Sequence, residues 1–259
     1  MTCQPVAMSR DLPTADDLVE RFVAALASRR DPDRAPAMAA YMRHQFPFLG
    51  VAAPAQQDAY REATAGLPRQ LPEPLVAAVA AELWRRPERE HQHLACRLVN
   101  RHASSRSATA ALLGTLESLL ATRPWWDTVD SLATHAVGDV VRQNPELRTT
   151  MDRWVRGDDM WLSRSALLHM NRWKDATDQE WLFAACLHLA GHRDFFVRKA
   201  IGWALRELTK TDEAAVVAFV EAHRDELSGL SRREALMWLE RRRRRPAESQ
   251  NIRGPSYPG

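Results

Sequence analysis

Cysteines and long apolar runs are both scarce in this sequence. The three cysteines, Cys3, Cys96 and Cys186, are widely spaced and odd in number, which argues against a disulfide framework and favours a reducing compartment. No stretch approaches the roughly 18 uninterrupted apolar residues that a membrane-spanning helix needs. Residues 1–13 also lack the basic-then-apolar order of a signal peptide. We therefore exclude an integral membrane protein and expect a cytoplasmic one.

Common catalytic and metal-binding motifs are missing as well. No glycine-rich phosphate loop follows a strand pattern, and no Ser-His-Asp arrangement can be placed. His188 and His192 are four residues apart, with Cys186 nearby, a spacing that suits zinc on a helix. However, Gly191 interrupts the expected helix and no glutamate completes an HExxH pattern. We therefore expect neither a metal nor a cofactor.

Lysine is the third scarcity, because only Lys174, Lys199 and Lys210 occur and nearly all other cations are arginines. The formal net charge is +3, so the type of cation is more informative than the total. One interpretation is that the arginine content reflects genome composition alone. The other is a phosphate-binding face, since guanidinium groups suit bidentate contacts with phosphate. The sequence leaves both interpretations open.

Apolar residues recur with the helical period, and no segment shows the sustained alternation of a half-buried strand. Leu18, Val19, Phe22 and Leu26 form one such stripe. Thr14 and Asp17 are spaced as a capping box, and Gly191 and Gly229 stand where helices are expected to end. These patterns predict an all-α protein.

The expected helices come in pairs that recur about every 35 to 45 residues, a spacing typical of helical-repeat arrays. We predict a HEAT-like α-solenoid of stacked antiparallel helical hairpins with a concave face. A single domain is expected over residues 14–243, preceded by a short extension over residues 1–13. Residues 244–259, which include the last two arginines of the run 241–245, are expected to form a disordered tail rich in Arg and Pro.

Three segments combine aromatic and charged residues in an unusual way. In Pro124-Trp125-Trp126-Asp127-Thr128-Val129-Asp130, two adjacent tryptophans cannot both face the core of a helix, whose neighbouring residues are about 100° apart. Trp126 and Asp130 share a face, because they are four residues apart. In the segment 195–206, Lys199, Trp203 and Arg206 place two cations around an indole. An ordinary amphipathic helix remains an alternative for both segments.

The third segment, 158–168, begins with two acidic residues and places Arg164 in the second turn of a helix. These three segments, together with residues 41–50 (YMRHQFPFLG), closely resemble the AlkD-type DNA glycosylases of the DNA alkylation repair family. The resemblance runs from about Leu18 to Arg243, and WWDTVD and FFVRKAIGWALRE carry it most specifically. It implies a HEAT-like fold that releases purines alkylated at N3 or N7 from duplex DNA, without a metal or cofactor.

The resemblance also implies roles for individual residues. Asp130, Trp126 and Trp203 would line the cleft around the damaged nucleotide as catalytic residues. Arg164 and Tyr41 would contact the DNA, and we expect the same of the cations Lys199 and Arg206. The implied reaction needs no base flipping, and a monomer could perform it.

The chemistry that these residues suit is the loss of a charged leaving group. An N3- or N7-alkylated purine already carries positive charge, so it needs no general acid, and one carboxylate suffices where ordinary glycosidases use two. Two other functions remain open: a non-catalytic HEAT-like protein that binds nucleic acid, and a helical-repeat scaffold for another protein. Release of free base from alkylated DNA would separate the enzyme from the binding protein.

Overall fold

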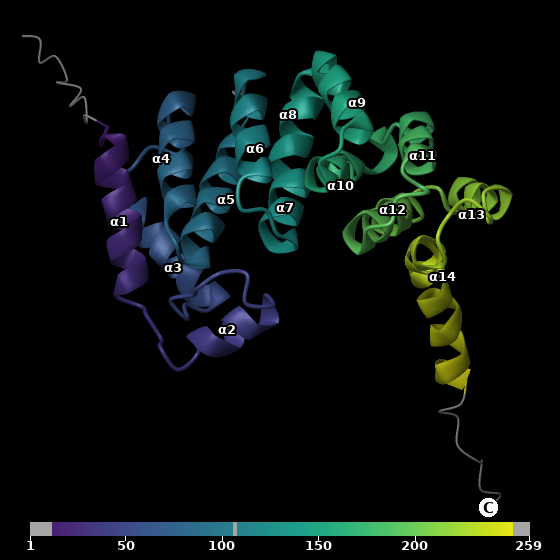
Figure 1. The fold of residues 1–259 in the computed structure, drawn as a ribbon, viewed down its shortest axis with the longest axis horizontal. Helices are drawn as coiled ribbons and strands as arrows, with labels where there is room; N and C mark the ends of the chain where they lie inside the picture. The colour runs from purple at the N-terminus through teal and green to yellow at the C-terminus, as the bar shows by residue number, and fades with distance from the viewer. Residues whose placement is uncertain (1–11, 106–107, 251–259) are drawn as a thin grey trace, which may run out of the picture. The chain divides into compact units, whose positions relative to one another are not determined.

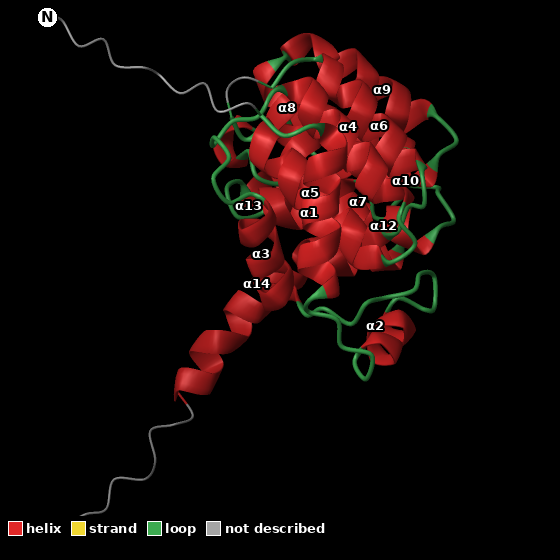
Figure 2. Cartoon of the chain, turned by 90° about the vertical axis from the view of Figure 1, so that its left-hand side faces the viewer, coloured by secondary structure: helices red, strands yellow, loops and turns green. Residues whose placement is uncertain are grey.

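The computed structural model describes the backbone of residues 12–105 and 108–250 and the side chains of residues 12–105 and 108–242. Within these ranges every regular element is a helix and no strand is present (Figure 2). The prediction of an all-α protein is confirmed. None of these helices is both long and apolar enough to cross a membrane. Where the sequence predicts a single domain over residues 14–243, the chain forms two compact units, Met1–Ser107 and Ala108–Gly259.

Over residues 12–105, the first unit contains five α-helices, coloured purple to blue in Figure 1. They are α1 (Ala15–Ala27), α2 (Ala35–Tyr41), α3 (Ala53–Ala63), α4 (Glu73–Arg85) and α5 (Arg89–Ala103). Helix α1 packs against α3 and α4, and α4 packs against α5. The predicted capping box is present, since Thr14 and Asp17 bond to each other's backbone at the start of α1. The apolar stripe of α1 is buried, with Leu18, Phe22 and Leu26 fully inaccessible.

A buried carboxylate fixes the loop that follows α2. Glu90, at the start of α5, is fully buried and accepts hydrogen bonds from the backbone N–H groups of Leu49, Gly50 and Val51 at 3.0, 2.8 and 3.0 Å. Gly50 has φ +87°, and a Cβ there would lie 1.9 Å from the carbonyl oxygen of Asp31. A charged side chain is tolerated in the core because three donors replace its hydration.

The second unit contains the remaining helices. They are α6 (Ala111–Ala121), α7 (Trp126–Leu132), η1 (Ala133–Val137), α8 (Gly138–Gln143), η2 (Pro145–Leu147), α9 (Arg148–Arg156), α10 (Met160–Leu168), η3 (Lys174–Ala176), α11 (Gln179–His188), α12 (Phe195–Leu208), α13 (Glu213–Ala222) and α14 (Gly229–Gln250). Helix α10 lies at the centre of this unit and contacts α7, α9 and α12. In each unit helices pack mainly on near neighbours in the sequence, so the solenoid-like packing is confirmed.

Two glycines allow helices of the second unit to approach closely. A Cβ on Gly138 would lie 2.2 Å from the carbonyl oxygen of His169, and one on Gly202 would lie 2.4 Å from the Cβ of Glu234. Helices α7, η1 and α8 follow one another without a break, and the middle turn, η1, is a π-helix. π-Helical turns occur frequently at functional sites. This one directly follows the helix that carries Asp130.

Two sequence expectations about helix ends differ from the structure. Gly229 does not end a helix as predicted, because it is the first residue of α14 while α13 ends at Ala222. A series of turns connects α13 to α14. The backbone of residues 244–250, in the segment predicted to be a disordered tail, is helical. Arginine is a good helix former, so the arginine run continues α14; residues 1–11, 106–107 and 251–259 lie outside the described residues.

Candidate active site

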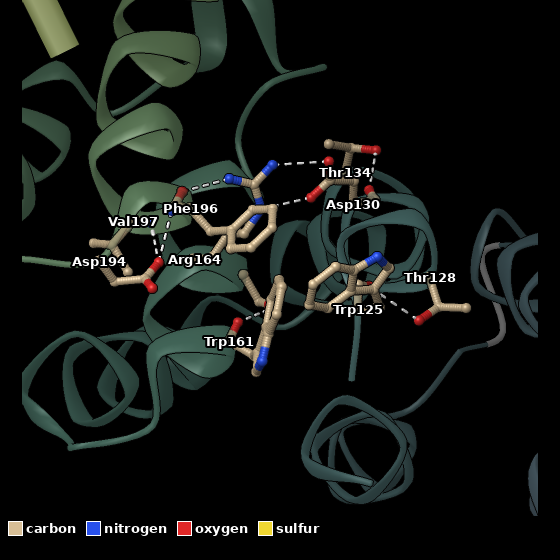
Figure 3. A network of polar contacts seen from close by, with 10 residues as sticks. Trp125, Thr128, Asp130, Thr134, Trp161, Arg164, Asp194, Phe196 and Val197 are labelled. Atoms are coloured by element: carbon tan, nitrogen blue, oxygen red, sulfur yellow. Dashed lines mark hydrogen bonds and ion pairs between the residues drawn. The ribbon is translucent and has the colours of Figure 1, made fainter. Parts of the chain in front are cut away.

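An ion pair between two helices forms the centre of the site (Figure 3). Asp130 on α7 accepts two hydrogen bonds from Arg164 on α10, from Nε to Oδ1 at 2.7 Å and from Nη2 to Oδ2 at 2.8 Å. The third guanidinium nitrogen, Nη1, donates to the backbone carbonyl of Phe196 on α12 at 2.5 Å. Arg164 therefore joins three helices, and the parallel two-bond geometry fixes the plane of the Asp130 carboxylate.

The two partners differ in exposure. The side chain of Arg164 is 4% exposed and that of Asp130 is 18% exposed, so the carboxylate remains the accessible member of the pair. Burial raises the pKa of Asp130 above its ordinary value, although the hydrogen bonds and charge of Arg164 act in the opposite direction. Since each carboxylate oxygen can accept more than one hydrogen bond, Asp130 keeps acceptor capacity beyond the two bonds from Arg164.

Aromatic side chains surround this ion pair. The Trp203 ring on α12 lies 6.0 Å from the guanidinium carbon of Arg164, and the Phe196 ring lies 5.9 Å from it. Trp125, Trp161 and Phe196 pack together with ring centroids 4.9 to 5.8 Å apart. The structure thus brings three of the predicted site residues, Asp130, Arg164 and Trp203, close to one another.

The two adjacent tryptophans have different surroundings. Trp125 precedes α7 as its N-cap, with extended backbone, and its ring joins the Trp161 and Phe196 cluster. Trp126 is the first residue of α7 and is half-buried. It lies one helical turn before Asp130, so the expected shared face is consistent with the helix that forms there.

Local capping explains why these helices begin where they do. Asp159 accepts the backbone N–H groups of Trp161 and Leu162 at the start of α10, and Asp194 accepts those of Phe196 and Val197 at the start of α12 (Figure 3). Both N-caps satisfy donors that the first helical turn leaves unpaired. At the other end of α7, the Thr134 hydroxyl donates to the backbone carbonyl of Asp130 at 2.8 Å. Each cap fixes the position of a site residue along its helix.

The other predicted DNA contacts lie in two places. Lys199 and Arg206 project from α12 toward the same carboxylate, Glu234 on α14, at 4.0 and 2.7 Å. Sequence reasoning missed Glu234, because its register against α12 depends on tertiary packing. Tyr41 belongs to the first unit, where it is the last residue of α2 and is 71% exposed.

The structure also adds two residues that the sequence did not single out. The carbonyl of Phe196 accepts a hydrogen bond from Arg164; a backbone acceptor leaves no mark in the sequence. Glu207 accepts a hydrogen bond from the Trp203 indole at 3.4 Å, and its i+4 spacing was the available signal.

Metal ligation finds no support in the described residues, where no group of three or more His, Cys, Asp or Glu side chains converges. Cys186 is fully buried, and burial raises the pKa of its thiol. His188 is exposed, and the His192 ring accepts the backbone N–H of Asp194. Cys186 thus packs in the core, and the His192 ring contributes to the turn before α12.

The fold and the site define a class: an all-α protein in which a buried arginine presents a carboxylate beside aromatic rings. The family model described as DNA alkylation repair enzyme matches residues 22–239. The chain therefore belongs to the DNA alkylation repair enzyme family, as the resemblance implied, and its role is that of an enzyme of DNA repair.

One solved structure is similar over most of the chain. It is described as a predicted DNA alkylation repair enzyme from Enterococcus faecalis, with a TM-score of 0.72 and 27% sequence identity. The match covers 82% of this chain and 97% of the other. No curated protein matches the sequence.

Proposed function

We propose that this protein is a DNA glycosylase that hydrolyses the N-glycosidic bond of N3- and N7-alkylated, cationic purines in duplex DNA. The observation that carries the proposal is the Asp130 carboxylate, held in a fixed plane by Arg164, whose guanidinium carbon lies 6.0 Å from the Trp203 ring. No such arrangement is needed to stabilise an ordinary helical surface. Membership of the DNA alkylation repair enzyme family supports the same conclusion.

Asp130 acts on the sugar rather than on the base. As the bond to the purine breaks, positive charge develops on the deoxyribose, and a preorganised carboxylate beside it lowers the energy of that transition state. The purine leaves as a neutral base because its alkyl group had already made it cationic, so no proton donor is required. Asp130 then orients a water molecule and accepts its proton, a role that its raised pKa favours.

Trp126 and Trp203 contribute through their ring faces. The π electrons of an indole attract a cation, and this attraction strengthens as charge develops on the sugar, by roughly 0.5 to 2 kcal/mol for each ring. Contacts made through the sugar leave the base unenclosed. The protein therefore acts without rotating the damaged nucleotide into a closed pocket, and bulky N3 and N7 adducts are substrates as well.

Arg164 is a positioning residue in this mechanism. Its guanidinium is almost fully buried and bonded to Asp130 and Phe196, so it fixes the carboxylate and favours its ionised form. The sequence-based prediction that Arg164 contacts the DNA backbone is untested. We propose positioning as its main role, because each of its three nitrogens already donates a hydrogen bond within the protein.

A second candidate is a non-catalytic protein that binds nucleic acid. One observation favours it: both oxygens of Asp130 are engaged by Arg164, as in a purely structural ion pair. The two candidates differ in a single assay. Duplex DNA methylated at purine nitrogens is incubated with the protein, and free base is separated and quantified over time. We expect 7-methylguanine to accumulate with one turnover per protein or more; binding of the duplex without any released base would support the second candidate.

A further inference from the structure

A cavity on the second unit lies beside the candidate active site. Its volume is about 590 Å³, and its walls come from the end of α10, the η3 turn, α11 and the C-terminal half of α12. Glu207 lines it and also accepts the hydrogen bond from the Trp203 indole. The cavity wall thus includes Ala204, the residue next to Trp203, as well as Glu207.

The charge of the cavity wall is positive. Three cations line it, Arg172, Lys174 and Lys210, against the single carboxylate of Glu207. Lys210 is paired with Glu207 at 2.5 Å, and Arg172 lies 3.6 Å from Asp139, which is outside the cavity wall. Lys174 has no ion-pair partner among the residues that the structure describes. Two of the three lysines in the chain are gathered here.

The backbone at Lys174 is strained. Its φ is +55°, in the left-handed region that a lysine adopts rarely and at a cost of order 1 kcal/mol or more. Such strain persists where the surrounding structure imposes it, and it clusters at functional sites. Here it occurs at an exposed lysine that lines the cavity.

The remainder of the wall is mixed: Leu167, Leu182 and Leu208 are among its apolar residues, and Asn171, Thr177 and Thr211 are polar. Pockets of about 300 to 1,000 Å³ with an apolar wall and a few polar groups suit small-molecule ligands. A nucleotide unit matches this cavity in chemistry, because its phosphate suits the cations and its sugar suits the apolar wall.

We propose that this cavity is a phosphate subsite for the DNA strand, and that it binds a nucleotide next to the one at Trp203. The inference rests on the proposed function for the location of DNA at Trp203, but not on the glycosylase chemistry. Lys174 and Arg172 are the two cations that supply the subsite with charge not already neutralised by Glu207.

Two substitutions test the subsite with little risk to the fold. Lys174→Asn removes the charge with a residue that tolerates left-handed backbone, and Arg172→Gln removes the second charge from an exposed side chain. Binding of an undamaged duplex to the full-length protein is measured by fluorescence anisotropy at several salt concentrations. Because each phosphate contact releases counterions, we expect the plot of log Kd against log salt to become shallower by about 2 in the double variant.

The controls separate this result from a general charge effect. Arg224→Gln removes an exposed cation from the turn that follows α13, outside the cavity, and we expect it to leave the slope unchanged. Lys174→Arg keeps the charge and should retain the parent slope. An unchanged slope in the double variant, or an equal loss in Arg224→Gln, overturns the proposal.

A second arm identifies the source of the phosphate. Backbone amide shifts of residues 171–174 and 210–211 are followed by NMR during titration with the undamaged duplex and, separately, with dGMP. We expect the duplex to shift these amides in the parent and not in the double variant. Shifts with dGMP alone would assign the cavity to a free nucleotide and overturn the strand proposal. Because the duplex is undamaged, the binding measurement and the NMR titration can both be interpreted even if the protein releases no base.

Discussion

At the scale of single residues, two opposing effects act on the Asp130 carboxylate. Burial disfavours its charge, whereas the guanidinium of Arg164 favours it, and burial has the larger effect. A carboxylic acid with a raised folded-state pKa stabilises the fold at low pH, and this contribution is lost as the pH rises through the folded pKa. Arg164 thus favours the ionised form that the proposed base release needs, against the effect of burial.

The first prediction concerns Arg164→Lys. Lysine keeps one positive charge but cannot form the two parallel bonds, so the plane of the carboxylate is no longer fixed and the pKa of Asp130 rises further. We expect base release at neutral pH to fall about 100-fold, the loss typical of a misplaced catalytic group. The acid limb of the pH–rate profile should also move to higher pH. A variant with the parent profile would show that Arg164 does not position Asp130.

A second prediction concerns His169, which follows the last residue of α10. Its side chain is buried, with 1% of the residue exposed, and its Nδ1 is hydrogen-bonded to the carbonyl of Ala166. Burial lowers its pKa to about 4. The unfolded chain therefore binds a proton that the folded protein does not, and the stability present above about pH 6.5 is lost as the pH falls toward 4.

Urea unfolding at pH 7 and pH 5 measures this effect. We expect the parent to lose about 2 kcal/mol between these pH values from His169, and His169→Gln to lose correspondingly less. An equal loss in both proteins would assign the acid sensitivity to other groups.

At the scale of helices, close packing at two glycines fixes the register of the elements that carry the site. Helix α12 contributes Trp203 and the Phe196 carbonyl, and it contacts α14 through Gly202. A side chain at Gly202 would overlap both Ser231 and Glu234, and backbone atoms are among those that would have to move.

The third prediction compares two glycines in helices. Gly202→Ala forces α12 away from α14, and we expect it to destabilise the protein by about 1 to 3 kcal/mol. Gly114→Ala is the matched control, because a Cβ there meets nothing within 4 Å. Since alanine favours a helix over glycine, we expect Gly114→Ala to stabilise the protein by up to about 1 kcal/mol. Chemical denaturation measures both, and the same sign for the two substitutions would contradict the packing described for Gly202.

Much of the helical structure can be predicted from the sequence because its signals are local. The capping box of Thr14 and Asp17 and the buried stripe of α1 each depend on residues within a few positions of one another in the sequence. Gly229 shows that such local signals can mislead. Glycine commonly follows the end of a helix, but Gly229 is the first residue of α14. The pairing of Asp130 with Arg164 spans 34 residues. Only the family resemblance placed these two residues in one site, and it did not indicate that they bond to each other.

The same limit applies to the predicted DNA-contacting cations. Lys199 and Arg206 are spaced to share a face of α12, and they do, but the packing of α14 places Glu234 against both. No periodicity along α12 reveals a partner on another helix. Their contact with DNA stays a prediction.

At the scale of the whole molecule, the choice of lesion depends on the charge of the damaged base in the proposed mechanism. The site centres on one carboxylate that acts on the sugar, and none of the residues assigned to it is a proton donor for the leaving base. Bases that leave readily only when protonated are therefore poor substrates, whatever their size.

The fourth prediction follows from this charge dependence. Duplexes that contain 7-methylguanine, a bulky N7-alkylguanine or the neutral lesion hypoxanthine are compared in base release. We expect the two cationic lesions to be released at rates within about tenfold of each other and hypoxanthine at least 100-fold more slowly, since general acid catalysis supplies roughly 10² to 10⁴-fold. Comparable release of hypoxanthine would require a proton donor that the account lacks.

The substitution Asp130→Asn tests whether the negative charge of Asp130 accelerates base release. Asparagine has nearly the same shape and can still accept a hydrogen bond from Arg164, but it carries no charge. The rate of 7-methylguanine release is measured in a single turnover with protein in excess, alongside the affinity for the same duplex. We predict a loss of about 10² to 10³-fold in rate, as for removal of one electrostatic stabiliser of a transition state, with affinity within a few-fold of the parent. Release at the parent rate would contradict the account.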